Sequence, residues 1–466
     1  MKQNETKSAD PVLLAPILRT GPAYWVIVAI LSAIVAWGMY AWVRQYVLGL
    51  GVTGMNRPVY WGLYITNFVF FIGISHAGTL ISAILRVAGA EWRRPITRAA
   101  EAITVFALIM GASQVLVDMG RPDRILNLIF YGRFQSPLLW DVLSIGMYFF
   151  GSITYLFLPM IPDLAILRDQ LPANAPRWRK SLYRVLALGW HGGAEQRRRL
   201  EKGIGIMAIL IIPLAVSVHT VVSWIFGMTL QPMWHTSIFG PYFVIGAIYS
   251  GIATIILAMA VIRKVFHLET YLKPLHFNYL GVLLVLFNVL WIYFTVSEYL
   301  TAGYGNVTAE GAVLQAKWSG EFAPVFWAMV VCMVLAFALL VFGRKLVKGR
   351  VITLVVIASL LVDFGMWLER FTIVVPTETR PQLGLYTIGV YQPTWTEWSI
   401  TAATFAGFVL LYVLFVKLFP IISIWEVQEA PEAIPSIAER LRSYLPGAAG
   451  VAAMSESSGQ AVGGGE

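Results

Sequence analysis

The chain has 466 residues, of which 58% are hydrophobic and only 13% are charged. Soluble domains carry about 25% charged residues, so this composition excludes a water-soluble globular fold and indicates an integral membrane protein. The net charge of +9 lies mainly in short loops between apolar stretches, a pattern typical of membrane topology that gives no support to nucleic-acid binding.

Ten apolar stretches follow a polar segment at residues 1–22, and each can cross about 30 Å of hydrocarbon as a helix. Lipid supplies no water to backbone polar groups, and the apolar runs do not alternate, so helices are favoured over a β-barrel. The first stretch is too long for a signal peptide and predicts an uncleaved anchor. The predicted spans are 23–47, 59–88, 98–119, 138–160, 203–226, 240–265, 275–300, 322–343, 350–374 and 397–421.

Lys and Arg residues are concentrated in alternate loops, near residues 86–98, 161–202, 263–273 and 344–350. Loops of this kind face the cytoplasm, so both termini are predicted to be cytoplasmic. The basic, proline-rich loop 161–202 has room for a short surface helix. Residues 426–466 are predicted to form a cytoplasmic, partly disordered tail, because Gly and Ser dominate their end.

The chain contains a single cysteine, Cys332. One cysteine cannot form an internal disulfide, a cysteine-ligated iron–sulfur cluster or a covalently attached c-type haem, so any such redox centre must belong to another protein of a complex. No two histidines have the same-helix spacing of a haem-b bundle. Ligation between His76 and His219 on different helices is the haem alternative that stays open.

Ionisable side chains inside membrane spans are costly to bury and mark candidate functional sites. Asp141 lies about one turn inside the outer surface, where a carboxylate can accept a proton from a quinol hydroxyl. The alternative is a helix-terminus carboxylate stabilised by the helix dipole. The residues that need an explanation are His76, Asp118, Asp141, His219, Glu298, Asp363 and Glu369.

His76 lies in the middle of the second span among small residues that allow a helix or a flat ring to approach closely. It can bond a quinone carbonyl and carry its proton, or it is satisfied by another helix. His76 lies about 15 Å from its cytoplasmic end, whereas Asp141 is near the outer surface. The two can share a pocket only if the second span begins after residue 65 or is tilted.

Three further groups are weaker candidates. The turn from Asp118 to Arg124 is best interpreted as a locally paired charged turn, with a share in the site as the alternative. His219 is a second histidine inside a membrane span, like His76. Glu298, at the outer end of the seventh span, is best interpreted as an interfacial anchor.

In the ninth span, Asp363, Trp367 and Arg370 fall on one helix face, with Glu369 beside them. Asp363 lies near the membrane midplane, where a carboxylate facing a bundle interior is typical of proton relays. An internal ion pair with Arg263 is the alternative.

The sequence Asp118-Met119-Gly120-Arg121-Pro122, followed by Ser136-Pro137-Leu138-Leu139-Trp140, is the most specific pattern in the chain. With Trp61 to Gly78 and Arg86, it resembles the NrfD/polysulfide-reductase membrane-subunit family over about residues 20–425. The Trp140-Asp141 pair, the ten spans and the basic 161–202 loop are most similar to the ActC branch of that family, found in alternative complex III.

The resemblance implies an all-α membrane fold of two four-helix bundles with one flanking helix at each end. The bundles would cover residues 58–226 and 227–374, and the flanking helices 23–57 and 375–425. It implies a quinol pocket in the first bundle near the outer face, with His76 and Asp141 as the catalytic pair. The predicted quinol-binding residues are Phe71, Gly73, Ser75, His76, Asp118, Arg121, Trp140 and Asp141.

The resulting expectation is a quinol-oxidising membrane subunit with non-covalent menaquinol, no haem or iron–sulfur cluster of its own, and a place in the bacterial cytoplasmic membrane. Its expected partners are c-type cytochrome subunits, an extrinsic iron–sulfur protein subunit, a second NrfD-like membrane subunit and lipids. A compatible hypothesis is proton translocation through His219, Glu298, Asp363, Glu369 and Arg370. The alternatives are a quinone-reducing subunit of another NrfD-type reductase, and a secondary transporter or scaffold.

Overall fold

The computed structural model describes residues 10–172, 175–343, 349–382 and 388–428. In these residues the only regular elements are helices, and ten of them are long and apolar enough to cross a membrane, which confirms the predicted multi-pass membrane fold. The spans are α2 (Pro22–Leu48), α3 to α5 (Leu63–Val87), α6 (Thr97–Asp118), α8 (Pro137–Gln170), α10 (Ala194–Gly227), α11 (Phe239–Val265), α12 (Pro274–Gly305), α14 with η5 (Ala323–Gly343), α16 (Val351–Glu378) and α17 (Trp395–Leu418).

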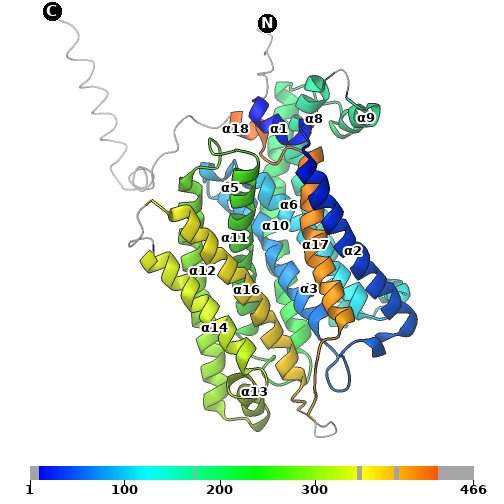
Figure 1. Ribbon diagram of the computed structural model, residues 1–466, viewed down its shortest axis with the longest axis vertical. Coiled ribbons are helices and arrows are strands. Elements are labelled where there is room, and N and C mark those ends of the chain that lie inside the picture. Colours follow the sequence, from blue (N-terminus) through cyan, green and yellow to red (C-terminus); the bar gives the residue numbers. More distant parts are fainter. Residues whose placement is uncertain (1–9, 173–174, 344–348, 383–387, 429–466) are drawn as a thin grey trace, which may run out of the picture. The chain divides into compact units, whose positions relative to one another are not determined.

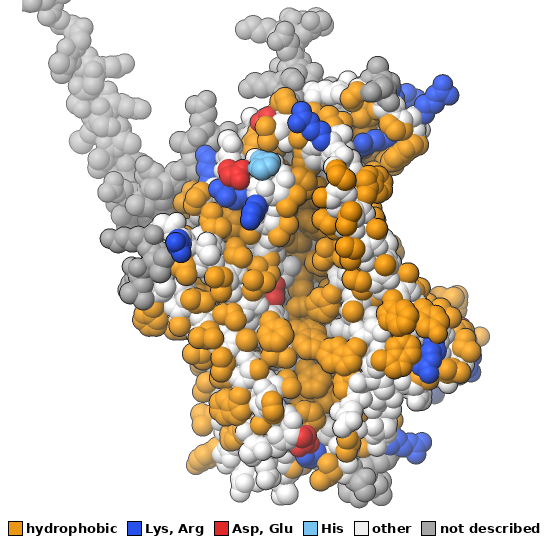
Figure 2. Space-filling model, viewed as in Figure 1, with side chains coloured by type: hydrophobic (Ala, Val, Ile, Leu, Met, Phe, Trp, Pro, Cys, Tyr) orange, Lys and Arg blue, Asp and Glu red, His pale blue; other side chains and the backbone are white. Residues whose placement is uncertain are grey.

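Hydrophobic side chains cover the middle of the surface seen in Figure 2, and most Lys and Arg side chains lie towards the two ends. Shorter elements lie between and beyond the spans. They are α1 (Pro11–Leu18), η1 (Leu50–Val52), η3 (Glu91–Arg93), η4 (Pro122–Arg124), α7 (Ile125–Phe130), α9 (Arg177–Leu186), α13 (Thr308–Trp318) and α18 (Ile424–Gln428). We call the end that carries α1, α9 and α18 the inner end, following the predicted orientation, and the end that carries α13 the outer end (Figure 1).

The predicted loop 161–202 is shorter in the structure, because α8 continues to Gln170 and α10 begins at Ala194. The expected surface helix is present as α9. The predicted ends followed apolar composition, whereas a helix that has left the hydrocarbon continues through polar residues as long as its backbone bonds persist. The tail from residue 429 lies outside the described residues.

The contacts between spans close into two rings of four helices. One ring contains α3 to α5, α6, α8 and α10, and the other contains α11, α12, α14 and α16. The two flanking helices, α2 and α17, pack along each other, and α17 also contacts α6 and α3 of the first ring (Figure 1). The flanking helices that the sequence places at opposite ends of the chain are therefore neighbours in space.

The span α3 to α5 is the most buried of the ten, and small residues explain how its neighbours approach. A Cβ atom added to Gly78 would lie 2.3 Å from Thr104 Oγ1 of α6. One added to Gly251 of α11 would lie 2.9 Å from the backbone nitrogen of Ala77. Close backbone contact of this kind is how membrane helices associate when lipid is as apolar as their side chains.

A buried ion pair closes the inner end of the first bundle. Arg98 of α6 donates to Asp163 of α8 at 2.6 Å, and both side chains are almost fully buried. Asp163 also accepts the backbone N–H groups of Ile424 and Trp425, each at 3.0 Å. Because its carboxylate is satisfied by three donors, the charge can be held away from water. The pair therefore fixes the chain that follows α17 against the bundle.

Replacing Asp163 by Ala should destabilise the folded protein by about 3–5 kcal/mol, because Arg98 would stay buried without its counter-ion. Thermal unfolding of the purified chain, with limited proteolysis after residue 420, measures this effect. Asp169→Ala is the matched control, since Asp169 pairs with Arg168 in an exposed position, and such pairs contribute about 0–1 kcal/mol. Equal losses in the two variants would contradict the assignment.

Candidate functional site

The central span departs from regular α-helix at His76. The helix α3 (Leu63–Ile74) ends just before it, and a π-helical turn, η2 (Thr79–Ile84), follows after one turn of α-helix. This shift turns backbone groups towards other helices, where side chains bond them. The carbonyl of Ser75 accepts from Thr104 Oγ1 at 2.6 Å and from Tyr148 Oη at 2.9 Å. π-Turns inside α-helices are frequent at functional sites.

His76 packs against His219 of α10. Their rings meet edge to face, with centroids 4.1 Å apart, and both residues are buried. His76 Nε2 lies 2.8 Å from the carbonyl oxygen of Ala215. Neither ring nitrogen of His219 has a hydrogen-bond partner among the described residues. Since one nitrogen of a neutral imidazole donates and the other accepts, His219 keeps both capacities for a small polar ligand.

Asp141 lies nearer the outer end than either histidine. The helices α8 and α10 run antiparallel, and Gly151 faces Ile211 while Gly203 faces Leu158. This register makes Asp141 level with about residue 221 of α10, which is about 3 Å outside His219. His76, whose Nε2 lies beside the Ala215 carbonyl, is further in. Tyr148, whose ring centroid is 5.7 Å from that of His76, follows Asp141 by about 10 Å along the axis of α8. Asp141, His219 and His76 therefore lie at successive depths from the outer end. The helix α3 begins at Leu63, so the second span does not begin after residue 65, which was one of the two conditions for a pocket shared by His76 and Asp141.

Asp141 Oδ1 is buried and has no hydrogen-bond partner among the described residues. No amide of the first turn of α8 bonds that oxygen, as an amide would bond a capping side chain. Its helix neighbours Ser144, Tyr148, Ser152 and Tyr155 are also buried. Their spacing of three or four residues puts them on one face of α8.

This polar face of α8 meets η2 and α6 in a row of hydrogen bonds. Tyr148 Oη and Thr79 Oγ1 are 2.7 Å apart. Nearer the inner end, Ser82 Oγ bonds Tyr155 Oη at 3.0 Å and also bonds Glu101. Glu101 is buried, with 3% of its surface exposed. Sequence reasoning missed these residues, although the 3.6-residue period of polar side chains in the fourth span and the carboxylate of Glu101 inside the third were visible signals.

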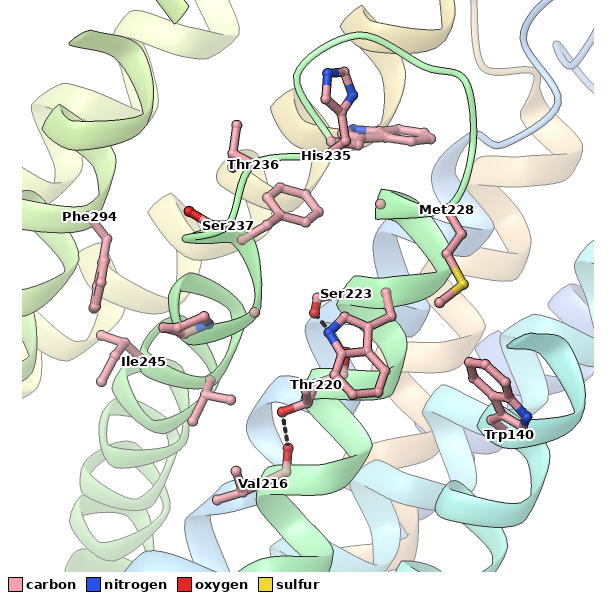
Figure 3. Close-up of a pocket in the computed structure, with 17 residues that line it drawn as sticks. Trp140, Val216, Thr220, Ser223, Met228, His235, Thr236, Ser237, Ile245 and Phe294 are labelled. Carbon is pink, nitrogen blue, oxygen red and sulfur yellow. Dashed lines mark hydrogen bonds between the residues drawn. The ribbon is translucent and has the colours of Figure 1, made fainter. Parts of the chain in front are cut away.

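A groove of about 840 Å³ opens at the outer end between α10, α11 and the segment that joins them (Figure 3). Trp140 and Met228 border one side of it, and Ile245 and Phe294 border the other. Trp224 and Met228 on its rim are 49% and 55% exposed. The remaining lining residues include Thr220, Ser223, Trp234, His235, Thr236 and Phe239. A large, mainly apolar cavity with a few polar groups is typical of a small-molecule site.

Two unpartnered groups flank this groove. Asp141 follows Trp140, which lines it, and His219 lies between Val216 and Thr220, which form part of its wall. His219 is itself fully buried and stands behind that wall.

The other residues of the predicted quinol set lie elsewhere. Phe71 packs on Phe405 and Phe408 of α17. Gly73 faces Ala247 and Ser250 of α11. Arg121 forms an exposed pair with Asp123 at 2.9 Å, as expected for a charged turn, and Asp118 Oδ1 is buried without a partner among the described residues. Ser75 contributes its backbone carbonyl to the site, while its hydroxyl bonds Ile72 within the same helix.

Of the ionisable residues of the second bundle, Glu369 lies near Lys317 and Arg370 lies near His219, whereas Asp363 lies apart from them. Asp363 accepts from Thr254 at 3.0 Å, whereas Arg263 donates to the Leu272 carbonyl, so these two do not form the considered ion pair. Glu369 pairs with Arg370 at 3.0 Å, about 9 Å from Asp363 along α16. These groups lie on separate levels of the bundle.

Glu298 is not the expected interfacial anchor. It is buried and accepts a hydrogen bond from Thr236 at 2.7 Å. The ammonium of Lys317 lies 5.4 Å from the ring centroid of Tyr299 in the same region. A carboxylate is tolerated there because a hydroxyl and a nearby cation offset its burial.

Comparison with known proteins gives the family of the chain. A family model described as polysulphide reductase, NrfD, matches residues 51–382. This chain belongs to the NrfD family. The match covers both bundles up to the end of α16. Asp141, His219, His76, the groove and the second-bundle carboxylates therefore all lie within the NrfD region.

Three relatives of this NrfD chain carry names that describe them as subunits of reductases or oxidoreductases. The chain is 28% identical over 257 residues to a putative dimethyl sulfoxide reductase membrane subunit of Halobacterium salinarum, a match that spans 55% of each chain. It is 25% identical to a selenate reductase subunit of Mesobacillus selenatarsenatis, over 75% of this chain and 83% of that one. It is 24% identical to the Hdr-like menaquinol oxidoreductase integral membrane subunit of Archaeoglobus fulgidus, over 77% of this chain and 80% of that one.

Replacing Thr104 by Val should destabilise the central span by about 1–3 kcal/mol, because the Gly78 amide would lose its acceptor and the Ser75 carbonyl one of its donors. Thermal unfolding of the purified chain measures the change. Thr154→Val is the matched control, since exposed Thr154 bonds only its own helix at Phe150. A larger loss in the control would count against the bonding role of Thr104.

Lys317 should make stability depend on pH. Burial lowers the pKa of Lys317 from 10.5 to about 8, with Glu298 acting in the opposite direction. Between these two values the unfolded chain binds more protons than the folded one, so stability rises with pH across that window. Lys317→Met does not titrate, so the stability of this variant relative to the wild type should fall from pH 8 to pH 10.5. A difference in thermal midpoint that does not vary with pH would contradict this.

Proposed function

We propose that this chain is the quinol-oxidising integral membrane subunit of a multi-subunit quinol:electron-acceptor oxidoreductase. The observation that carries the proposal is the pair of buried, unpartnered groups, Asp141 and His219, beside an apolar groove at the outer end. Membership of the NrfD family supports it, as does the name of the Archaeoglobus relative, a menaquinol oxidoreductase subunit.

The chemistry fits the groups available. Oxidation of a quinol to a quinone releases two protons and two electrons, so the site needs two proton acceptors and an external electron acceptor. Asp141 and the His219–His76 pair supply the proton acceptors at the depth of the groove. The apolar walls around Trp140 and Phe294 suit a quinone ring and its isoprenoid tail. Asp141, the outermost of the three, returns its proton towards the outer surface.

The electrons need a partner, since one cysteine cannot hold a cluster. We propose an extrinsic iron–sulfur subunit at the outer end, followed by c-type cytochrome subunits, in a complex of the alternative complex III type with a second NrfD-like membrane subunit. We propose menaquinol as the substrate and the bacterial cytoplasmic membrane as the location. The Archaeoglobus relative's name supports the quinol type.

We propose that proton translocation, where it accompanies the reaction, uses the polar groups of the first bundle. The row Tyr148–Thr79 and Tyr155–Ser82–Glu101 runs from the histidine pair towards the inner end. Asp363 and Glu369 of the second bundle lie about 9 Å apart along α16. Moving one charge against 100 mV costs about 2.3 kcal/mol, so translocation also needs sufficient driving force from the quinol reaction.

Asp141→Asn and His219→Gln should each lower quinol oxidation by about 10²–10⁴-fold, because each removes a proton acceptor. The assay uses the purified complex, a soluble electron acceptor, and partner metal content as the measure of assembly. Asp123→Asn is the matched control, since Asp123 is exposed at the same end. Wild-type rates in both site variants of an intact complex would refute the proposal.

Glu101→Gln tests the first-bundle row separately. Quinol oxidation should persist, because Glu101 lies well inside the histidine pair, while any proton uptake beyond the protons released from quinol should disappear. Proteoliposomes containing the complex give the number of protons per electron. Glu369→Gln is the control in the second bundle. If Glu369→Gln alone loses translocation, the proton path lies in the second bundle and not in the first.

A further inference from the structure

The helix α9 stands apart from the spans at the inner end, beside the ends of α8 and α10 (Figure 1). Its buried side is fixed to two other elements. Tyr183 Oη donates to the Leu418 carbonyl at 2.7 Å. Arg179 donates to the carbonyls of Lys417 at 2.5 Å and Ile17 at 3.1 Å. The helix therefore has a defined position that links α1 to the end of α17.

The other side of α9 exposes large apolar side chains. Trp178 is 59% exposed and Val185 is 65% exposed, and they lie seven residues apart on one face. Leu188, just beyond the helix, is 64% exposed. Water-exposed Trp and aliphatic side chains gathered on one helix face indicate a surface that another phase or partner covers.

A basic stripe runs beside this apolar face. Arg177 and Arg184 are exposed and also lie seven residues apart. At 100° per residue, the arginine stripe is about 100° from the Trp178 stripe around the helix axis. An apolar face bordered by Lys or Arg is typical of helices that lie in the plane of a membrane surface.

The position of α9 along the bundle agrees with such a surface. The apolar part of α8 ends before Arg168, and the apolar part of α10 begins after Lys202. The helix between them therefore lies at the level where the spans leave the hydrocarbon. Arg198 and Lys202 are exposed at the start of α10, so the surroundings add positive charge. Anionic lipid headgroups complement this charge, whereas zwitterionic headgroups do not.

We propose that α9 is a binding site for anionic phospholipids. In this site the face formed by Trp178, Val185 and Leu188 enters the boundary between headgroups and acyl chains, and Arg177 and Arg184 bind the lipid phosphates. Because α9 holds Ile17 and Lys417 by hydrogen bonds, bound lipid also stabilises the packing of α1 against the end of α17. The site is separate from the groove and does not depend on the proposed quinol chemistry.

The test uses the purified full chain in detergent. Native mass spectrometry compares binding of phosphatidylglycerol and phosphatidylcholine with identical acyl chains to wild type and to the double variant Arg177→Gln/Arg184→Gln. Phosphatidylglycerol should bind more tightly to the wild type. The double variant should lose about fivefold in affinity per arginine, which corresponds to about 1 kcal/mol for each basic residue near a charged surface. Arg124→Gln/Arg133→Gln, which removes two exposed arginines at the outer end, should bind like the wild type.

A second measurement tests the apolar face. Brominated phosphatidylglycerol should quench the fluorescence of Trp178, which is the difference between the emission of the wild type and that of Trp178→Phe. Inorganic phosphate should not prevent this quenching. Equal binding of the two lipids, or wild-type binding in the double variant of Arg177 and Arg184, would overturn the proposal. So would competition by inorganic phosphate without any quenching at Trp178, because the site would then bind a free anion and not a lipid.

Discussion

The close approach of helices around the span Leu63–Val87 is the constraint on which the rest of the site depends. Glycine at positions 78 and 251 lets α6 and α11 reach its backbone, so the span is covered by protein on all sides. Irregular backbone is tolerated at membrane depth only under such cover. The π-turn after His76 is possible for this reason. So is the Ser75 carbonyl that accepts hydrogen bonds from side chains of α6 and α8.

Membrane thickness made much of the fold predictable. A span must be apolar for about 20 residues whatever its neighbours, so the ten stretches were visible in the sequence and agree with the ten helices. Their ends were less predictable at α8 and α10, where polar residues continue the helix outside lipid. The helix pairings needed more than composition: nothing in the chain's periodicity indicates that α2 packs on α17.

The candidate site shows the same division. His76, Asp141 and His219 could be found because buried ionisable groups are rare in membranes. That Asp141 lies further out than His76 was also predictable from the helix rise. The depth of His219 relative to Asp141 was not, because it depends on the register between α8 and α10. Phe71, Gly73 and Arg121 were predicted as one set from the motifs that carry the family resemblance. In the structure they face different partners, namely α17, α11 and the surface. Glu101 was within reach of sequence reasoning, since it is a carboxylate inside an apolar span.

The pairing of α2 with α17 has a consequence for biogenesis. Gly38 of α2 meets Ala403 of α17 so closely that a Cβ at Gly38 would lie 2.1 Å from that of Ala403, and few other residues of α2 are buried. At about 5–20 residues per second, a ribosome takes tens of seconds to proceed from one helix to the other. During that interval α2 sits in the bilayer without its main protein neighbour. A nascent chain that stalls before α17 therefore displays the small-residue surface around Gly38 to the lipid.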